Sequence, residues 1–183
     1  PDRRGSHVIL FRHCDRRFPF LWESAAQPGA RWHAEGEGPA HYFAVTPVGA
    51  WAEFLRHEGV RDEKDLEGIR RALWAAEIPL ETLEVHEPAL DSGVMRGGTV
   101  SYRRCQAEAR RLRAAGAQAI RAPSAALQTG GAGGWIVDGG ERPSSPRDGI
   151  VLVVFGPPGE CAGWPVVETG APPARVLARV RHL

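Results

Sequence analysis

Short apolar runs, separated by glycine, proline and polar stretches, recur along this chain and indicate β-strands. Each run is four to eight residues long and rich in β-branched or aromatic side chains, which is typical of buried strands. The predicted strands are HVILF (7–11), HYFAV (41–45), IPLETLEV (78–85), AQAIRAP (117–123) and GIVLVVFG (149–156). Pro79 places the third of these at a sheet edge or makes it start late. The tail RVLARVRHL (175–183) fits a strand or a helix, and we favour a strand.

Three other segments have helical patterns. Thr46 can cap a helix that begins at Pro47 and ends before Gly59, since each residue suits its place at a helix end. A second helix is predicted from about Asp62, with one apolar face. That face consists of Leu66, Ile69, Leu73 and Trp74. A third is predicted over about 101–115, where Gly116 ends it; its buried face is Tyr102, Cys105, Ala109 and Leu112.

Strands and helices in this mixed order predict one α+β domain over residues 1–183. The chain has 183 residues, 43% of them apolar and 25% charged, which are values of a globular protein. The net charge of +1 gives no electrostatic reason to expect direct binding of nucleic acid or an anionic membrane. No apolar run approaches the roughly 18 residues of a membrane span. We therefore expect neither partner.

Cysteine and glycine motifs exclude several other kinds of site. The three cysteines are odd in number, widely spaced and without a CxxC pair, which favours a reduced, cytoplasmic protein without structural zinc. The segment GGAGG (130–134) lacks the lysine and the hydroxyl residue of a phosphate-binding loop, and it predicts a flexible loop that could close over a substrate. The seven histidines have no metal-ligand spacing. No metal is expected.

Three segments together carry a family resemblance. ILFRHC (9–14) places an arginine at a strand end, RWHAEGEGPAHYFAVTPVGAWAEFLRH (31–57) joins Arg–Trp to a strand and a helix with an inner glutamate, and IRAPSAAL (120–127) contains Pro–Ser. In this order the chain resembles the RES domain family over roughly residues 8–155, with residues 156–183 as a C-terminal strand extension. His33 departs from the family pattern, which often has Asn after Arg–Trp.

The resemblance implies a fold like that of ADP-ribosyltransferases, with a mixed β core, flanking helices and NAD as substrate. Members of the family degrade NAD by phosphorolysis or hydrolysis, or transfer ADP-ribose to protein, and several are toxins neutralised by a companion antitoxin. Carried over by position, the catalytic residues are Glu53, Arg31 and Ser124. The residues that bind NAD are Arg12, Arg31, Tyr42 and Ser124.

The chemistry of NAD cleavage suits these residue types. Positive charge grows on the ribose carbon as nicotinamide leaves, so a carboxylate such as Glu53 stabilises the transition state more than the ground state. Guanidinium groups of Arg12 and Arg31 can each bind two phosphate oxygens. Tyr42 offers an aromatic face to the nicotinamide ring, and Ser124 a positioning hydrogen bond to the ribose or nicotinamide part.

Helical periodicity alone argues against this role for Glu53. At about 100° per residue, Glu53 lies nearly opposite the side of Trp51 and Leu55, where a solvated glutamate is expected. Its neighbours on the wheel, Gly49 and Ala50, are small and would let a ligand approach.

Three hypotheses on function follow. The leading one is an NAD-consuming enzyme that uses phosphate or water as acceptor, acts as a toxin and is controlled by an antitoxin. The second is a protein ADP-ribosyltransferase with the same site. The third is a nucleotide-binding module without catalysis.

Overall fold

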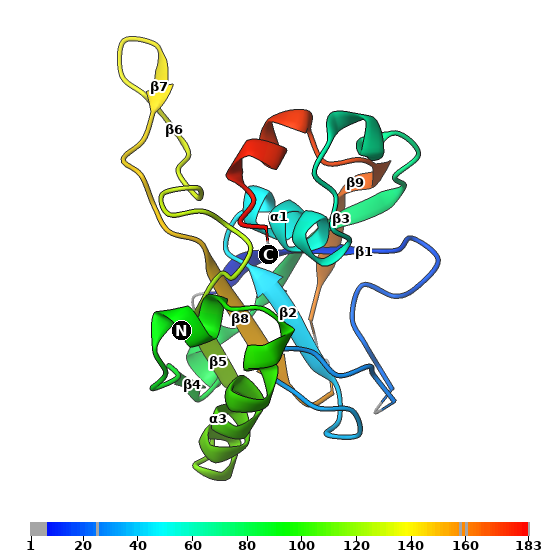
Figure 1. Ribbon diagram of the computed structural model, residues 1–183, viewed down its shortest axis with the longest axis vertical. Coiled ribbons are helices and arrows are strands. Elements are labelled where there is room, and N and C mark those ends of the chain that lie inside the picture. Colours follow the sequence, from blue (N-terminus) through cyan, green and yellow to red (C-terminus); the bar gives the residue numbers. More distant parts are fainter. Residues whose placement is uncertain (1–6, 25, 158, 160, 183) are drawn as a thin grey trace, which may run out of the picture.

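A mixed β-sheet forms the centre of the molecule (Figure 1). The computed structural model describes residues 7–24, 26–157, 159 and 161–182, and in these residues seven strands pair in the order β4-β5-β8-β2-β1-β3-β9. They are β1 (Val8–Cys14), β2 (Ala40–Ala44), β3 (Arg71–Ile78), β4 (Val85–His86), β5 (Ala119–Pro123), β8 (Ile150–Phe155) and β9 (Gly163–Gly170). Strands β4 and β5 are parallel and the other neighbours antiparallel. A separate hairpin of β6 (Trp135–Val137) and β7 (Glu141–Pro143) projects from the body.

The helices are short. They are α1 (Pro47–His57), α2 (Ser92–Arg96) and α3 (Tyr102–Ala114), with 3-10 turns η1 (Glu63–Leu66), η2 (Leu80–Thr82), η3 (Thr99–Ser101) and η4 (Ala174–Arg179). The side chain of Thr46 accepts a hydrogen bond of 3.0 Å from the backbone N–H of Gly49 and so caps α1. Gly59, at φ +67°, follows its end in the left-handed conformation that glycine adopts without strain.

The core has three groups of packed side chains, and two of them hold helices on the sheet. Trp51 and Leu55 of α1 pack with Val176 and Val180 from the C-terminal segment. The buried face of α3 packs on β5 and β8; it consists of Cys105, Ala109 and Leu112. The third group includes Leu10, Phe43 and Leu152 on successive strands of the sheet. Figure 1 shows α1 beside β1 and η4, and α3 beside β5.

The structure confirms the α+β class with a mixed sheet, the strands predicted at 7–11, 41–45, 117–123 and 149–156, and the helices that begin at Pro47 and near 101. The predicted helix from Asp62 is wrong. Its first residues form η1, Gly68 at φ +81° ends the turn, and the rest belongs to β3. Because β3 lies between β1 and β9 and is buried on both faces, its continuous apolar run imitates one helical face.

The strand predicted at 78–85 is also largely wrong. Pro79 leads into η2, and β4 pairs only over Val85 and His86. The C-terminal extension contains β9, but the described part of the tail forms η4 instead of a strand. Val176 lies in η4 and Val180 follows it in extended conformation, and both reach the core beside α1. Within the described residues, no helix has the length and apolar character to cross a bilayer.

Candidate active site

A cavity of about 550 Å³ lies where β1 and β2 separate. In the described part of the chain these strands share one register pair, Phe11 with Ala44, whereas β1 pairs with β3 along its whole length. The cavity lining comes from both strands, from α1, from the loop after β1 and from the segment that begins α3. Its size falls within the range of about 300–1,000 Å³ common for small-molecule sites.

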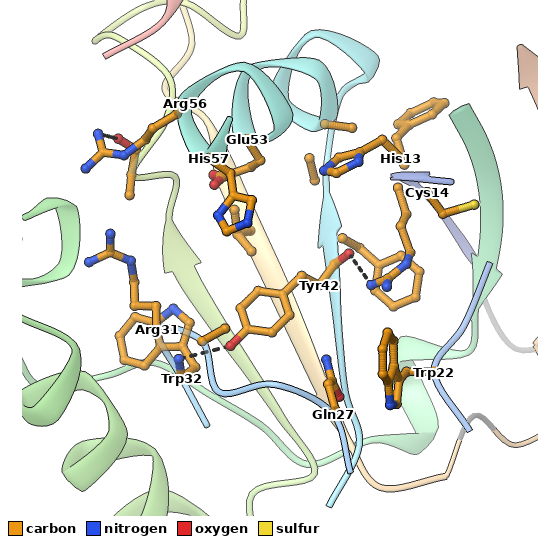
Figure 2. A pocket seen from close by; sticks show the side chains of 18 of the residues that line it. His13, Cys14, Trp22, Gln27, Arg31, Trp32, Tyr42, Glu53, Arg56 and His57 are labelled. Carbon is orange, nitrogen blue, oxygen red and sulfur yellow. Dashed lines mark hydrogen bonds between the residues drawn. The ribbon is translucent and has the colours of Figure 1, made fainter. Parts of the chain in front are cut away.

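Glu53 enters this cavity from α1 (Figure 2). Its side chain is partly buried rather than solvated as the helical wheel predicts, because that side of α1 faces the gap between the strands. Its Oε1 accepts a hydrogen bond of 2.7 Å from Ser124 Oγ. Burial raises the pKa of Glu53 above its usual range, while this hydrogen bond and the charges of Arg31 and Arg56 oppose the rise.

Ser124 holds Glu53 from behind. The serine is 3% exposed and is not part of the cavity lining. Its hydroxyl donates to Glu53 and accepts from the backbone N–H groups of Ala126 (3.1 Å) and Leu127 (3.2 Å). The hydroxyl thus has its donor and acceptor positions filled by protein. In the structure Ser124 contacts Glu53 and the backbone instead of lining the cavity, and its predicted hydrogen bond to the substrate stays a prediction.

Arg31 lines the cavity on the side of α3. Its Nη1 donates to Ser101 Oγ at 3.1 Å and its Nη2 to the carbonyl of Gly97 at 2.8 Å. The guanidinium also lies 4.9 Å from the centre of the Tyr102 ring, a cation–π distance. These contacts fix the positive charge near Glu53 but occupy two of the donors that a phosphate group would use.

Arg12 lines the cavity from β1. Its Nη1 donates to the carbonyl of Tyr42 at 3.3 Å, a long hydrogen bond. Burial lowers the pKa of Arg12, and the neighbouring Arg71 lowers it further. Among the described contacts, the guanidinium of Arg12 makes one hydrogen bond to protein and that of Arg31 makes two, so Arg12 has more N–H groups available to a ligand.

Tyr42 stands in the middle of the cavity wall, with Arg31 and Trp32 on one side and His13 and Cys14 on the other in Figure 2. Its hydroxyl accepts from the backbone N–H of Trp32 at 3.0 Å and bonds to His33 Nδ1 at 3.0 Å. The hydroxyl is committed to protein groups, so a ligand meets the ring alone.

His33 fixes the direction of that second bond. Its Nε2 bonds to the carbonyl of Pro28 at 3.0 Å, and a carbonyl can only accept, so Nε2 carries the proton and Nδ1 accepts from Tyr42. Burial lowers the pKa of His33, which favours this neutral form. The residue that departs from the family pattern thus supports the position of Tyr42.

Two further arginines, Arg56 and Arg71, line the cavity and were not predicted from the sequence motifs. Arg56 follows Glu53 by three residues on α1. Its guanidinium donates to the carbonyls of Ala125, Arg181, Arg96 and Gly97. It therefore ties the C-terminal segment and α2 to the helix that carries Glu53. The one sequence signal for this residue is its spacing from Glu53, since residues three apart share a helix face.

The structure thus brings Arg12, Arg31, Tyr42 and Glu53 to one cavity, with Ser124 behind Glu53. In the described ranges of the chain, no cluster of three or more His, Cys, Asp or Glu side chains is arranged to hold a metal ion.

The fold and this cavity define an α+β protein with a cavity of small-molecule size, into which a partly buried carboxylate points. A family profile described as "RES domain" matches residues 9–137, and the chain belongs to this family. The match includes all five predicted site residues and ends at the last residue of β6.

Among solved structures, the chain is similar to the crystal structure of the M. tuberculosis MbcT–MbcA toxin–antitoxin complex. The TM-score is 0.58 at 16% identity, over 90% of this chain and 86% of that chain. At this identity the likeness shows the fold alone. No curated protein sequence matches the chain significantly.

Proposed function

We propose that this protein consumes NAD by cleaving the bond between nicotinamide and ribose, with phosphate or water as the acceptor. Membership of the RES family supports NAD as the substrate. The observation that carries the proposal is the carboxylate of Glu53, held by Ser124 in a cavity that Arg12, Arg31 and Arg56 also line.

Glu53 would act electrostatically. Nicotinamide leaves as a neutral group, and the ribose carbon gains positive charge in the transition state, as in other glycosyl cleavages. A fixed carboxylate stabilises that charge without having to reorganise. Because burial raises the pKa of Glu53, the charges of Arg31 and Arg56 and the Ser124 hydrogen bond help to keep it ionised.

The remaining residues would orient the dinucleotide. Arg12 has donors for the pyrophosphate, and Arg31 adds a fixed positive charge although Ser101 and Gly97 occupy two of its N–H groups. The ring of Tyr42 would pack against the nicotinamide. Positioning of this kind lowers the barrier because the entropy of alignment is lost on binding rather than in the reaction.

We further propose that the protein is a toxin restrained by an antitoxin that covers the cavity. The support is the similarity in fold to a protein solved in a toxin–antitoxin complex. An NAD-consuming enzyme depletes a cofactor that its own cell needs, so such an activity requires control.

Incubation of the purified chain with NAD, with and without phosphate, tests the reaction. ADP-ribose phosphate formed only with phosphate indicates phosphorolysis, and free ADP-ribose in both cases indicates hydrolysis. ADP-ribose attached to protein would assign the chain as a transferase instead. NAD that binds and is recovered intact would refute the enzymatic proposal and favour a nucleotide-binding module.

A further inference from the structure

A second arginine, Arg71, lies beside Arg12 in the cavity and outside the segments that carry the family resemblance. It begins β3, the strand next to β1 in the sheet. Its Nη2 bonds to His13 Nδ1 at 3.2 Å, and its guanidinium lies 5.2 Å from the centre of the Phe54 ring. These contacts aim the side chain across the end of β1 instead of outwards to solvent.

In the described part of the protein, Arg71 alone of the two has a carboxylate within salt-bridge distance, and a third arginine shares that carboxylate. The hydrogen bond of Arg12 goes to a carbonyl, that of Tyr42. Arg71 approaches the carboxylate of Asp15 only to 4.0 Å, and Asp15 is bound by Arg17 through both of its oxygens at 3.1 and 2.8 Å. The Nε atoms of both arginines are buried without a hydrogen-bond partner. Cations placed together in this way are costly unless an anion joins them.

His13 adds a third donor and no negative charge. Burial, together with Arg71 and Arg12, lowers the pKa of His13 to about 3, so the ring is neutral at physiological pH. Because Nδ1 accepts from Arg71, the ring proton is on Nε2. Two guanidinium forks and an imidazole N–H form a donor set that matches the oxygens of a phosphate group.

We propose that Arg12 and Arg71, with His13, form a binding site for a phosphate-class anion in this cavity. Two sources have this chemistry: the pyrophosphate of a dinucleotide and free inorganic phosphate. The existence of the site is independent of the reaction, whereas the choice between these sources rests on the proposed function. Arg71 adds a second guanidinium beside that of Arg12, and its Nη2 also bonds to His13.

Calorimetric titration of the full chain with inorganic pyrophosphate and with inorganic phosphate tests the site. The variants are Arg12→Gln, Arg71→Gln and Arg71→Lys. Arg70→Gln is the matched control, since Arg70 is the exposed neighbour that bonds only to the carbonyl of Ile69 among the described contacts. It removes the same charge without touching the cavity.

We expect Arg12→Gln and Arg71→Gln each to weaken binding of the anion by about tenfold or more, because each removes a charge-assisted fork. Arg71→Lys should retain part of the affinity and Arg70→Gln nearly all of it. Anion binding that ADP-ribose abolishes assigns the site to the dinucleotide pyrophosphate. Phosphate binding that persists in saturating ADP-ribose assigns it to free phosphate.

Three results would overturn the site: no binding of either anion to the wild type, unchanged affinity in the Arg71 variants, or an equal loss in Arg70→Gln. Wild-type titration decides the first of these even if an arginine variant fails to fold. Parallel measurement of NAD consumption separates the two proposals. A wild type that binds pyrophosphate through Arg71 but leaves NAD intact would refute the proposed function and keep the site.

Discussion

Replacement of Ser124 by Ala isolates the support that the protein gives to Glu53. The substitution removes one hydrogen bond of 2.7 Å to the carboxylate and leaves the backbone N–H groups of Ala126 and Leu127 without their acceptor. It leaves the cavity lining unchanged, because Ser124 is not part of it. Any loss of activity must therefore pass through Glu53 or the loop that follows β5.

The expected loss can be worked from that hydrogen bond. A hydrogen bond to a charged group contributes about 1.5–3 kcal/mol. If this hydrogen bond stabilises the transition state and not the bound substrate, its removal lowers kcat by about 10- to 150-fold, since about 1.4 kcal/mol corresponds to a factor of ten. We expect KM for NAD to change by less than about threefold, because the serine makes no contact with the cavity.

The pH profile of the Ser124→Ala rate gives a second readout, which would stay unchanged if Ser124 only stabilised the fold. Ser124 lowers the pKa of Glu53 against the effect of burial. Its removal raises that pKa further, so the fraction of ionised Glu53 falls at a given pH. The acid limb of the rate profile should move to higher pH, and the variant should recover part of its activity in alkaline buffer.

The assay is the initial rate of NAD consumption between about pH 5 and 9, with Ser24→Ala as control. Ser24 also accepts a bond from the backbone N–H two residues later, that of Ala26, but in an exposed loop. A Ser124→Ala protein that folds and keeps wild-type kcat and pH profile would refute the role of Ser124. An equal change in Ser24→Ala would refute it as well.

Three other substitutions test the framework of the site. Arg56→Gln should lower the free energy of unfolding by about 1–3 kcal/mol and speed hydrogen exchange in η4, because the guanidinium holds the carbonyls of Ala125 and Arg181; unchanged exchange would contradict this. Tyr42→Phe should destabilise the fold by about 1–3 kcal/mol, because the backbone N–H of Trp32 loses its acceptor. The KM for NAD should stay the same, and a large rise in KM would show that the hydroxyl binds substrate. Leu55→Ala should cost about 2–5 kcal/mol in chemical denaturation, since Leu55 is 0% exposed; a smaller loss would mean that α1 packs loosely.

The sequence was informative where local physical chemistry decides the structure. Thr46, Pro47 and Gly59 define α1 because each satisfies a need at a helix end that no distant residue alters. The run at 149–156 had to be a strand wherever it paired. In contrast, β3 was predicted as a helix, because a strand buried on both faces has no alternation to reveal it.

The sequence likewise identified some residues of the candidate site and missed others. The family motif pointed to Glu53, whereas helical periodicity placed this residue in solvent. Periodicity fails here because it carries no information on the separation of β1 and β2 beneath α1. Nothing local distinguishes Arg71 from its exposed neighbour Arg70. The contrast between them arises from strand pairing, which places Arg71 beside His13. Long-range contacts of this kind are invisible in a single sequence.

Glu53→Gln, compared with the wild type, tests the central claim most directly. Glutamine keeps the size of the side chain and removes its charge, so NAD should still bind with an affinity within a few fold of the wild type. Its rate of NAD consumption should fall by about 10²- to 10³-fold or more, the usual loss when one group that stabilises transition-state charge is removed. A Glu53→Gln protein that consumes NAD at close to the wild-type rate would contradict the account.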